Sequence, residues 1–245
     1  MAKGSTGNTQ KVRVLRIIAR MNVGGPAVQV SGLMRGFDQE LFAQELLTGY
    51  CAADEADYIE KVATDVQAIR IDGLGRSIKP RADLFALFAI VKEIRRFKPD
   101  VVHTHTAKAG VVGRIASILS GHRSVRVHTF HGHLLNGYFG SFKRMLVVLA
   151  ERILAVFTHQ LLAVGDKVRQ DLLAVGIGKS EKFGLMPPGL EIGKLQNKRD
   201  SQEFYGLSQQ AIQCAFIGRV TQIKRPDRFL DAVSEIKRRG VPIEF

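Results

Sequence analysis

The chain has 245 residues, of which 45% are hydrophobic and 24% are charged, and this composition excludes disordered, collagen-like and coiled-coil proteins. Its length suits one large domain or a domain and a half. Lysine and arginine outnumber aspartate and glutamate by 36 to 23, and the net charge of +13 favours an anionic partner such as nucleic acid, anionic lipid or a phosphorylated metabolite.

Targeting signals and disulfides are not expected. No apolar run reaches the roughly 18 residues that a membrane-spanning helix needs, and the first ten residues lack the apolar segment of a secretory signal. Two cysteines, Cys51 and Cys214, do not make a disulfide framework. These features suit a protein of the reducing cytoplasm.

Apolar runs rich in β-branched residues alternate with helical periodicity along the chain. We expect strands at 12–18, 45–50, 66–71, 101–105, 125–130, 160–164 and 183–186. Val30, Leu33, Met34 and Phe37 predict a first helix between the first two strands. Later helices are expected from Pro80 to just before Pro99, after Thr106, and at 142–157 and 167–175.

Two of these helices have an expected buried face. The helix that begins at Pro80 is expected to bury Leu84, Leu87, Phe88, Val91 and Ile94. The next is expected to have Thr106 as its N-cap, Gly121 as its C-terminal stop, and a buried face of Val111, Ile115 and Ile118.

The alternation predicts an α/β fold with a doubly wound, mostly parallel, Rossmann-like sheet. Ligands of such folds bind outside the carboxyl ends of the strands. The loops to inspect are therefore 21–26, 103–108 and 129–138.

The sequence becomes more polar after Gly189. We expect residues 1–189 to form the first domain, residues 190–210 a polar linker with a short helix, and residues 211–245 the start of a second domain. That second unit is expected to contain a strand at 212–217, a helix at 226–239 with Phe229, Leu230, Val233 and Ile236 facing inward, and a strand at 241–245. Two strands and one helix are too few to bury a hydrophobic core of their own. We therefore expect the second domain to be incomplete.

Two glycine-containing segments raise the question of phosphate binding. Gly24 and Gly25 join the first strand to the first helix, where a bare backbone and a helix N-terminus favour an anion, although a plain tight turn would need the same residues. Residues 176–180 (GIGKS) resemble the end of a P-loop, but the first glycine of that motif would fall at Leu173 and the segment follows a helix. Gly176 is better explained as a helix C-cap.

Five histidines follow two neighbouring strands: His103, His105, His128, His131 and His133. They could ligate zinc, but both loops lack the carboxylates that a hydrolytic metal site would use, so no metal is expected. Strand alternation places His103 and His105 on one face. We expect structural roles for His103 and His128, and functional roles for His131 and His133 in their glycine-containing loop.

At these residues the chain resembles the family 4 glycosyltransferases. The resemblance is carried by residues 101–106 (VVHTHT) with 108–110 (KAG), by residues 128–133 (HTFHGH), by the Gly24–Gly25 loop and by the domain end at 188–189 (PG). Further along, Gly218, Arg219 and Lys224 match a G-R-x4-K motif that opens the second domain of that family. Each motif is weak alone, but together they occur in the family's order over nearly the whole chain.

The resemblance implies a GT-B fold, in which an N-terminal domain mainly binds the acceptor and a C-terminal domain binds the nucleotide-sugar donor. It implies sugar transfer with retention of configuration, without a metal or other cofactor, in cell-surface polysaccharide or glycolipid synthesis. Arg219 and Lys224 would contact the donor diphosphate, and two cations there would stabilise the charge that develops on the leaving group. Gly24 and Gly25 would border the phosphates or the acceptor, and His131 would lie near the transferred sugar.

The resemblance also leaves questions open. Candidate acceptor contacts are His105, Lys108, His133 and Tyr138. The paired glutamates of the family's second domain would lie beyond Phe245, so the chain alone is expected to be inactive. The alternative hypothesis is a nonenzymatic Rossmann domain that binds nucleotides or other anions, either a truncated paralogue or a subunit completed by another chain.

The distribution of charge bears on the partner. Residues 35–75 carry nine carboxylates against three cations, whereas residues 76–126 carry eleven cations against three carboxylates. This basic stretch, with Lys143 and Arg144, suits peripheral binding to an anionic membrane at its cytoplasmic face. The apolar residues Phe142, Met145, Leu146 and Leu149 are expected to pack on the sheet rather than on lipid. Nucleic-acid binding is disfavoured because no basic helix with interleaved aromatic residues is present.

Overall fold

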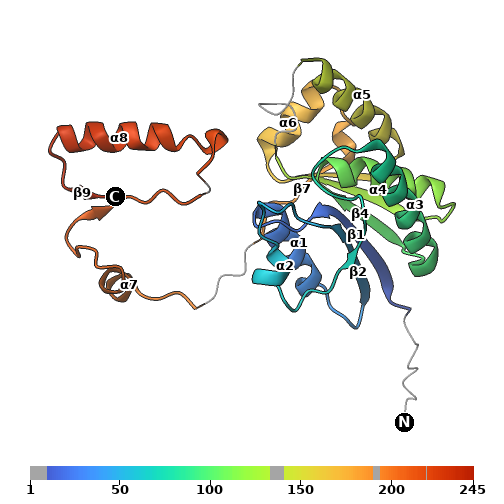
Figure 1. The fold of residues 1–245 in the computed structure, drawn as a ribbon, viewed down its shortest axis with the longest axis horizontal. Coiled ribbons are helices and arrows are strands. Elements are labelled where there is room, and N and C mark those ends of the chain that lie inside the picture. The colour runs from blue at the N-terminus through green and yellow to red at the C-terminus, as the bar shows by residue number, and fades with distance from the viewer. Residues whose placement is uncertain (1–9, 133–140, 190–193, 219) are drawn as a thin grey trace, which may run out of the picture. The chain divides into compact units, whose positions relative to one another are not determined.

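The computed structural model describes residues 10–132, 141–189, 194–218 and 220–245 (Figure 1). Its chain forms two compact units, Met1–Leu190 and Glu191–Phe245, which are described separately below as unit 1 and unit 2. Within the described ranges, no helix is long and apolar enough to cross a membrane.

Unit 1 is built on a seven-stranded sheet in which every paired strand is parallel. The strand order is β3-β2-β1-β4-β5-β6-β7, so the chain leaves β1 in one direction and returns to its other side at β4. The strands are β1 (Val12–Arg20), β2 (Phe42–Gly49), β3 (Ile69–Arg70), β4 (Val101–His105), β5 (Val125–Phe130), β6 (Gln160–Ala163) and β7 (Phe183–Leu185). This is the predicted doubly wound Rossmann-like sheet, and the strand order identifies β1 and β4 as its topological switch point.

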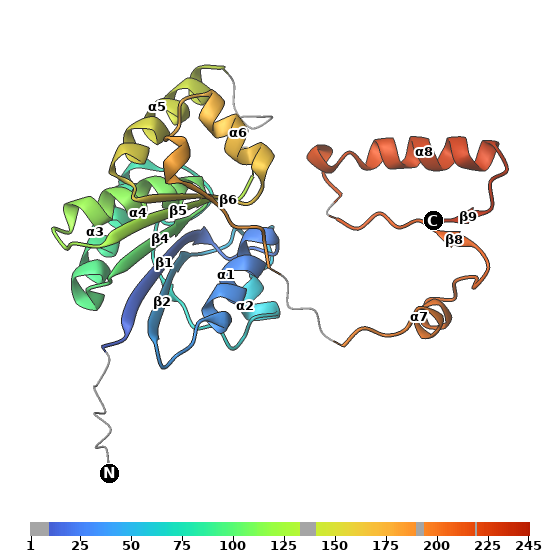
Figure 2. The ribbon, with the colours of Figure 1, turned by 180° about the vertical axis from the view of Figure 1, so that it is seen from behind.

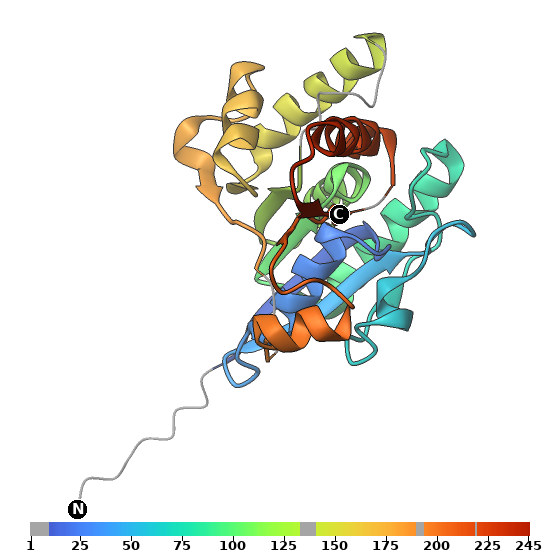
Figure 3. The same ribbon diagram turned by 90° about the vertical axis from the view of Figure 1, so that its left-hand side faces the viewer.

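Helices cover both faces of this sheet (Figures 1 and 2). They are α1 (Gly25–Gly36), α2 (Tyr58–Lys61), α3 (Pro80–Phe97), α4 (Ala107–Leu119), α5 (Ser141–Phe157), α6 (Asp166–Ala174) and the short 3-10 helix η1 (Ser180–Lys182). Helices α1 and α2 pack on one face, and α3 and α4 pack on the other. Helices α5 and α6 pack together with β5, β6 and β7, at the edge of the sheet that β7 forms (Figure 3).

The alternation of side chains along β1 explains why both faces need covering. Leu15, Ile17 and Ala19 are buried against α3 and α4, while Ile18 is buried with Val30 of α1 on the other face. A strand that is apolar on both faces can be buried only in the middle of a covered sheet.

Helix α3 confirms the predicted ends but corrects the predicted face. It begins at Pro80 and ends at Phe97, and Lys98 takes a left-handed conformation just before Pro99. Val91 and Ile94 are buried as predicted, but Leu84 and Phe88 are 53% and 61% exposed. The observed buried stripe runs from Ala86 through Ile90 to Phe97, so it is rotated from the predicted one and leaves Leu84 and Phe88 outside it.

Helix α4 also turns a different face to the sheet from the one predicted. Its buried residues include Gly113, Arg114 and Ala116, whereas Ile118 is 40% exposed. A Cβ at Gly113 would lie 2.8 Å from Cγ2 of Thr104, so this helix approaches the sheet through its small residues. Periodicity counts large apolar residues and therefore missed this face.

The ends of the helices test the capping predictions. Thr106 precedes α4, but its side chain does not cap the helix and instead accepts a hydrogen bond from the Ala19 amide, with an N to Oγ1 distance of 3.3 Å. The predicted N-cap is therefore wrong. Gly121 and Gly176 both follow helices with positive φ angles of 72°, which confirms the predicted C-terminal roles.

Unit 2 contains α7 (Lys198–Phe204), β8 (Ile212–Gln213), the 3-10 helix η2 (Gln222–Lys224), α8 (Pro226–Arg238) and β9 (Ile243–Glu244), with β8 and β9 parallel. The expected strand at 212–217 is thus only two residues long. Phe229 contacts the rings of Phe216 and Phe245, but Leu230 is 62% exposed rather than inward-facing. Among the described residues of this unit, no apolar side chain is fully buried.

Candidate functional site

The loops that follow β1 and β4 lie side by side because the two strands are neighbours in the sheet. Ile18 of β1 is paired with His105 of β4, and His105 in turn with Thr129 of β5. The carboxyl ends of these strands therefore bring three predicted segments to one edge: the Gly24–Gly25 loop, the end of β4 and His131. This edge is the place where doubly wound folds bind ligands.

The Gly24–Gly25 loop is held from the side by the segment that leads into α2. The Tyr58 amide donates to the Met21 carbonyl oxygen at 2.6 Å, and the Val23 amide donates to that of Ala56 at 3.0 Å. A Cβ on Gly25 would meet no atom within 4 Å, and one on Gly24 would make only ordinary contacts. Neither glycine is required by packing, so their effect is to leave the N-terminus of α1 open.

Three histidines and a threonine form a polar cluster on the α1 face of the sheet. The Nε2 of His103 lies 2.8 Å from Oγ1 of Thr129, and the His103 and His105 rings are 4.1 Å apart between centroids. The Nδ1 of His105 lies 3.0 Å from Nε2 of His131. We call His103, His105 and His131 the histidine cluster. Its ring contact confirms that His103 and His105 share one face.

A buried cation lies beneath the histidine cluster. Arg16 is paired in register with His103, and its side chain has no exposed surface. The guanidinium bonds to the Gln44 side chain and lies 4.5 Å from the Phe37 ring centroid, with no carboxylate partner among the described residues. Burial lowers the pKa of Arg16 to about 10, which leaves it cationic at neutral pH.

The histidine cluster is uncharged at neutral pH. Burial lowers the pKa of His103 to about 3, aided by the charge of Arg16, and lowers that of His131 to about 4. Burial also holds the pKa of His105 well below its usual value, and the neighbouring histidines and Arg16 act in the same direction. Neutral imidazoles can each donate one hydrogen bond and accept one, so this cluster offers polar contacts rather than charge.

The backbone between His105 and α4 is strained. Thr106 has a φ of 66° and a ψ of 158°, a conformation that β-branched residues rarely adopt. Its hydroxyl ties the end of β4 to the Ala19 amide of β1. Strain of about 1–3 kcal/mol at the switch point is typical of a position held for function.

Two of the predicted acceptor contacts have other partners in the structure. His105 has no exposed surface, so its ring lies beneath His131 rather than in contact with solvent. The ammonium of Lys108 donates to the carbonyl oxygens of Gly73 and Ser77 and is 2.6 Å from the carboxylate of Asp83. Lys108 thus anchors the loop before α3.

Of the remaining predicted site residues, His133, Tyr138 and Arg219 lie outside the described residues. Lys224 ends η2, and its side chain is exposed and free of ion pairs within the part of the chain that is described. The neighbouring Arg225 is already engaged, because its guanidinium binds the carboxylate of Asp227 with N to O distances of 2.6–2.9 Å.

On the opposite face of the sheet lie His128, for which the sequence predicts a structural role, and an ion pair that the sequence analysis missed. His128 bonds through Nδ1 to Oγ1 of Thr104 at 2.8 Å, and its ring occupies the space beside Gly110. One turn further along α4, Arg114 binds Glu151 of α5 at 2.7 and 2.8 Å, and both side chains are 1% exposed. A charged residue between apolar ones in the middle of each helix was the available signal for this pair.

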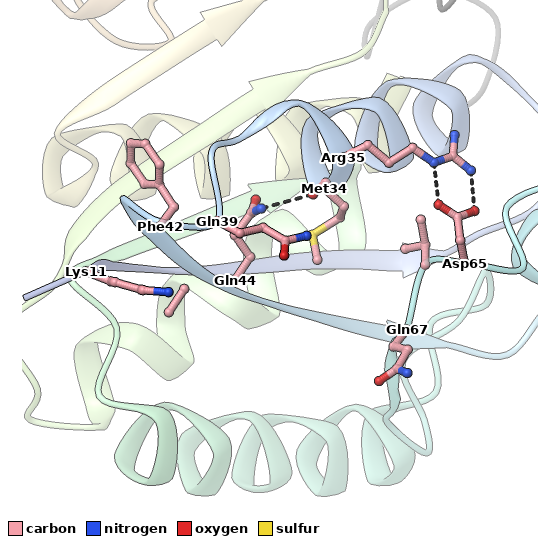
Figure 4. Close-up of a pocket in the computed structure, with 10 residues that line it drawn as sticks. Lys11, Met34, Arg35, Gln39, Phe42, Gln44, Asp65 and Gln67 are labelled. Atoms are coloured by element: carbon pink, nitrogen blue, oxygen red, sulfur yellow. Dashed lines mark hydrogen bonds and ion pairs between the residues drawn. The ribbon is translucent and has the colours of Figure 1, made fainter.

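A metal centre and a surface groove are two further kinds of site that could bind a ligand. Across the described ranges, no group of three or more His, Cys, Asp and Glu residues is arranged to hold a metal ion. A groove of about 500 Å³ lies at the opposite, amino end of β1 and β2, and it is lined by Met34, Phe42, Gln44 and the Arg35–Asp65 ion pair (Figure 4). It is not at the switch point, so it is separate from the loops described above.

Comparison with known proteins was made by family, by sequence and by structure. The family model of Glycosyltransferase Family 4 matches residues 23–193, which is more than half of the chain. The chain is 30% identical over 188 residues to UDP-Gal:alpha-D-GlcNAc-diphosphoundecaprenol alpha-1,3-galactosyltransferase of Escherichia coli, covering 74% of this chain and 46% of that protein. It is 21% identical over 212 residues to the capsular polysaccharide biosynthesis glycosyltransferase CapM of Staphylococcus aureus, covering 78% of this chain and 55% of that protein.

A solved structure extends the likeness to the fold. Anabaena HepE, crystallised in complex with UDP, matches with a TM-score of 0.66 and 16% identity over 96% of this chain and 68% of that one. The chain spans about half the length of the curated relatives it matches. Its parallel seven-stranded sheet with helices on both faces has the Rossmann-like form found in GT-B glycosyltransferases. From the family match and the motifs of β4 and β5, the chain belongs to glycosyltransferase family 4.

Proposed function

We propose that this protein transfers a sugar, with retention of configuration, from a nucleotide-sugar donor to a lipid-linked or glycan acceptor in cell-surface polysaccharide or glycolipid synthesis. The observation that carries the proposal is the meeting of the open Gly24–Gly25 loop, the strained end of β4 and His131 at the switch point of a family 4 chain. The names of its relatives support the same substrate classes, namely a UDP-sugar and a diphosphoundecaprenol-linked sugar in one and a capsular polysaccharide in another.

The proposed roles follow from the chemistry of each group. The open N-terminus of α1 favours a phosphate or another electron-rich group of a ligand. His131 gives a polar contact to the transferred sugar or its leaving phosphate. Arg219 and Lys224 bind the donor diphosphate, and the exposed position of Lys224 at the end of η2 supports this role. No metal takes part in the proposed reaction, so a chelator should leave turnover unchanged.

Acceptor binding is proposed for His133 and Tyr138. His105 and Lys108 contribute to it indirectly, because His105 supports His131 and Lys108 anchors the loop before α3. We therefore propose that the acceptor binds mainly at residues 131–138, which follow β5 in the sequence.

Diphosphate binding tests the donor role of unit 2. The test uses the chain extended to the length of its family 4 relatives, called the full-length version below. In it, Arg219→Ala and Lys224→Ala should each weaken binding of the nucleoside diphosphate about ten- to a hundredfold in calorimetry, since a charged hydrogen bond contributes roughly 1.5–3 kcal/mol. Binding of the bare nucleoside should change little. Lys237→Ala, which removes an exposed cation from the last turn of α8, is the matched control. Small and equal effects on both ligands would remove the phosphate-binding role.

Turnover distinguishes an enzyme from a binding domain. The full-length protein should transfer a sugar from one of a panel of nucleotide sugars to a polyprenyl-diphosphate-linked or glycan acceptor, and the anomeric configuration of the product should match that of the donor. Saturable nucleotide binding with no transfer to any acceptor in the panel would favour the nonenzymatic alternative.

We also propose that unit 1 rests peripherally on an anionic membrane at the cytoplasmic face. The apolar stripe of α5 was expected to pack on the sheet, but Met145, Leu146 and Leu149 are 57%, 48% and 52% exposed, which corrects that expectation. Helices α3, α4 and α5 pack side by side on one face of the sheet (Figure 1). Phe85 and Phe88 of α3 are exposed as well. Apolar side chains beside basic ones suit the boundary of an anionic bilayer.

Vesicle sedimentation tests this surface. Binding should grow with the anionic lipid content and weaken at high salt, because screening shortens the reach of surface charge from about 10 Å at 0.1 M to about 3 Å at 1 M. Leu149→Asp and Arg144→Glu should each reduce binding. Leu41→Asp is the control, because Leu41 is 54% exposed in the loop before β2. Salt-independent binding to neutral vesicles would contradict the proposal.

A further inference from the structure

The ring of His105 lies at the carboxyl end of β4 and has a close partner in His131. Its Nδ1 is 3.0 Å from Nε2 of His131, which is a hydrogen-bond distance between two ring nitrogens. The ring of His105 has no exposed surface, whereas that of His131 is half-buried. One of the two rings must donate an N–H to the lone pair of the other, and the direction decides which nitrogen of His131 carries its proton.

The surroundings of His105 indicate that it is the donor. Both rings are neutral at pH 7, since burial lowers the pKa of each, so each carries one N–H. The Nε2 of His105 is buried and has no hydrogen-bond partner among the described residues. If His131 donated, that Nε2 would hold an orphaned N–H. If His105 donates, it holds only an unused lone pair, and orphaned donors are the rarer case in buried sites.

We propose that His105 is a positioning residue, which donates its Nδ1–H to Nε2 of His131 and thereby fixes the His131 ring with its proton on Nδ1. That Nδ1 has no partner among the described residues, so it remains available as a neutral hydrogen-bond donor. A donor at this edge of the sheet fits an oxygen of a sugar hydroxyl or of a diphosphate. This catalytic consequence rests on the proposed function, whereas the tautomer itself does not.

The packing around His105 holds its ring in place. His103 packs against His105 with ring centroids 4.1 Å apart and is itself held by Thr129 through a contact of 2.8 Å. His105 therefore cannot turn away without displacing a buried, bonded neighbour. A supporting group locked by packing is what a precisely oriented donor requires.

The tautomer can be measured without any enzyme assay. In the 245-residue chain labelled with ¹⁵N-histidine, the ring nitrogen shifts of His131 should show the proton on Nδ1. The His131 signals are assigned as those that disappear in His131→Gln. His105→Asn should keep it there, because its amide N–H takes the place of the imidazole Nδ1–H. His105→Asp should move it to Nε2, because a carboxylate can only accept. A proton on Nε2 in the unmodified chain would overturn the proposal, whether or not the variants fold.

Kinetics of the full-length enzyme test the consequence. His105→Asn should keep kcat within about threefold, whereas His105→Asp should lower kcat on the order of a hundredfold with a much smaller change in KM, because a fixed wrong tautomer removes a contact made in the transition state. His122→Asn, a change outside the histidine cluster, is the control. Equal losses in the Asn and Asp variants would assign His105 to packing alone. Absence of turnover in the unmodified enzyme would refute the proposed function and leave the tautomer measurement standing.

Discussion

At the scale of single residues, the polar side chains of β1 and β4 are the ones whose surroundings matter most. Arg16 and His105 have no exposed surface although both are types that usually reach water. Arg16 keeps its charge and the histidines lose theirs, because the intrinsic pKa of arginine is high enough to survive burial. The result is a neutral, hydrogen-bonded cluster above a buried cation.

This cluster predicts that the protein is destabilised by mild acid. The pKa of His103 is about 3 and that of His131 about 4 in the folded chain, against 6.5 in an exposed histidine. Between these pH values the unfolded chain therefore binds more protons than the folded chain. The free energy of unfolding is highest above about pH 6.5 and falls as the pH drops toward 4. The fall is up to about 1.4 kcal/mol per pH unit for each histidine.

Urea unfolding at about pH 7.5 and about pH 5 measures this loss, in a window above the titration of most carboxylates. The difference should shrink in the double variant His103→Gln/His131→Gln and persist in His122→Gln. A free energy of unfolding that is the same at both pH values would show that the cluster is not neutral by burial.

His131 is predicted to act in the chemical step. In the full-length enzyme, His131→Ala should lower kcat about a hundredfold and change KM less, since the loss of one polar contact made in the transition state costs on the order of 3 kcal/mol. Steady-state kinetics with a saturating donor separate the two parameters. An unchanged kcat would assign His131 to structure.

Gly110 gives a residue-scale prediction about stability. A Cβ at this position would lie 2.4 Å from Cε1 of His128, so Gly110→Ala should destabilise the fold by about 1–3 kcal/mol through overpacking. Gly32 is a matched helical glycine with open space around it, and Gly32→Ala should stabilise by up to about 1 kcal/mol through helix propensity. Thermal and urea unfolding compare the two. A gain in stability from Gly110→Ala would mean that the His128 ring moves aside easily.

At the scale of elements, α4 contacts its neighbours through glycines and a buried ion pair, which its hydrophobic pattern does not predict. It approaches the sheet through Gly110 and Gly113 and meets α5 through the Arg114–Glu151 pair. Arg114 also donates from Nε to the Gly110 carbonyl oxygen at 2.7 Å, so the same side chain bonds within α4 and across to α5. The packing of α5 against α4 depends on this buried pair.

The pair predicts a non-additive mutational response. Glu151→Gln should destabilise the protein by about 3–5 kcal/mol, because it leaves the guanidinium of Arg114 buried without its counter-charge. The double variant Arg114→Met/Glu151→Leu should cost less than the single one, since neither charge remains to be buried. Urea unfolding gives both values, and a double-mutant cycle with Arg114→Met and Glu151→Leu as its single variants gives the coupling between the two residues. Additive losses would show that the two residues do not depend on each other.

At the scale of the whole molecule, the two units differ in how well they are packed. Unit 1 has three clusters of buried apolar residues, whereas the described part of unit 2 leaves Ile217 and Val220 93% and 82% exposed. A segment that buries so little apolar surface gains little stability of its own.

We therefore predict that the 245-residue chain is inactive and unevenly stable. Limited proteolysis should remove unit 2 and leave a resistant fragment ending near Leu190, and incubation with nucleotide sugars and acceptors should give no transfer. A full-length version serves as the control and should resist cleavage at the same sites. Steady turnover by the 245-residue chain, or equal resistance of both units, would contradict the prediction.

The sequence by itself determined the alternation of strands and helices, the parallel sheet, the ends of α3 and the family, because these depend on short-range periodicity, proline and glycine signals, and contiguous motifs. It did not determine which face of α3 or α4 is buried, since Leu84 and Ile118 have the right spacing but face outward. Nor did it pair Arg114 with Glu151, which are 37 positions apart.

Only the tertiary structure decided how the predicted site residues divide. Strand pairing sets Thr129 beside His105, where its hydroxyl reaches His103, and places His128 on the opposite face. From α4, Lys108 reaches the loop before α3. These relations join residues about 25 to 35 positions apart. The residue types at the switch point can be read locally, but burial, partners and protonation depend on neighbours that only the folded sheet brings together.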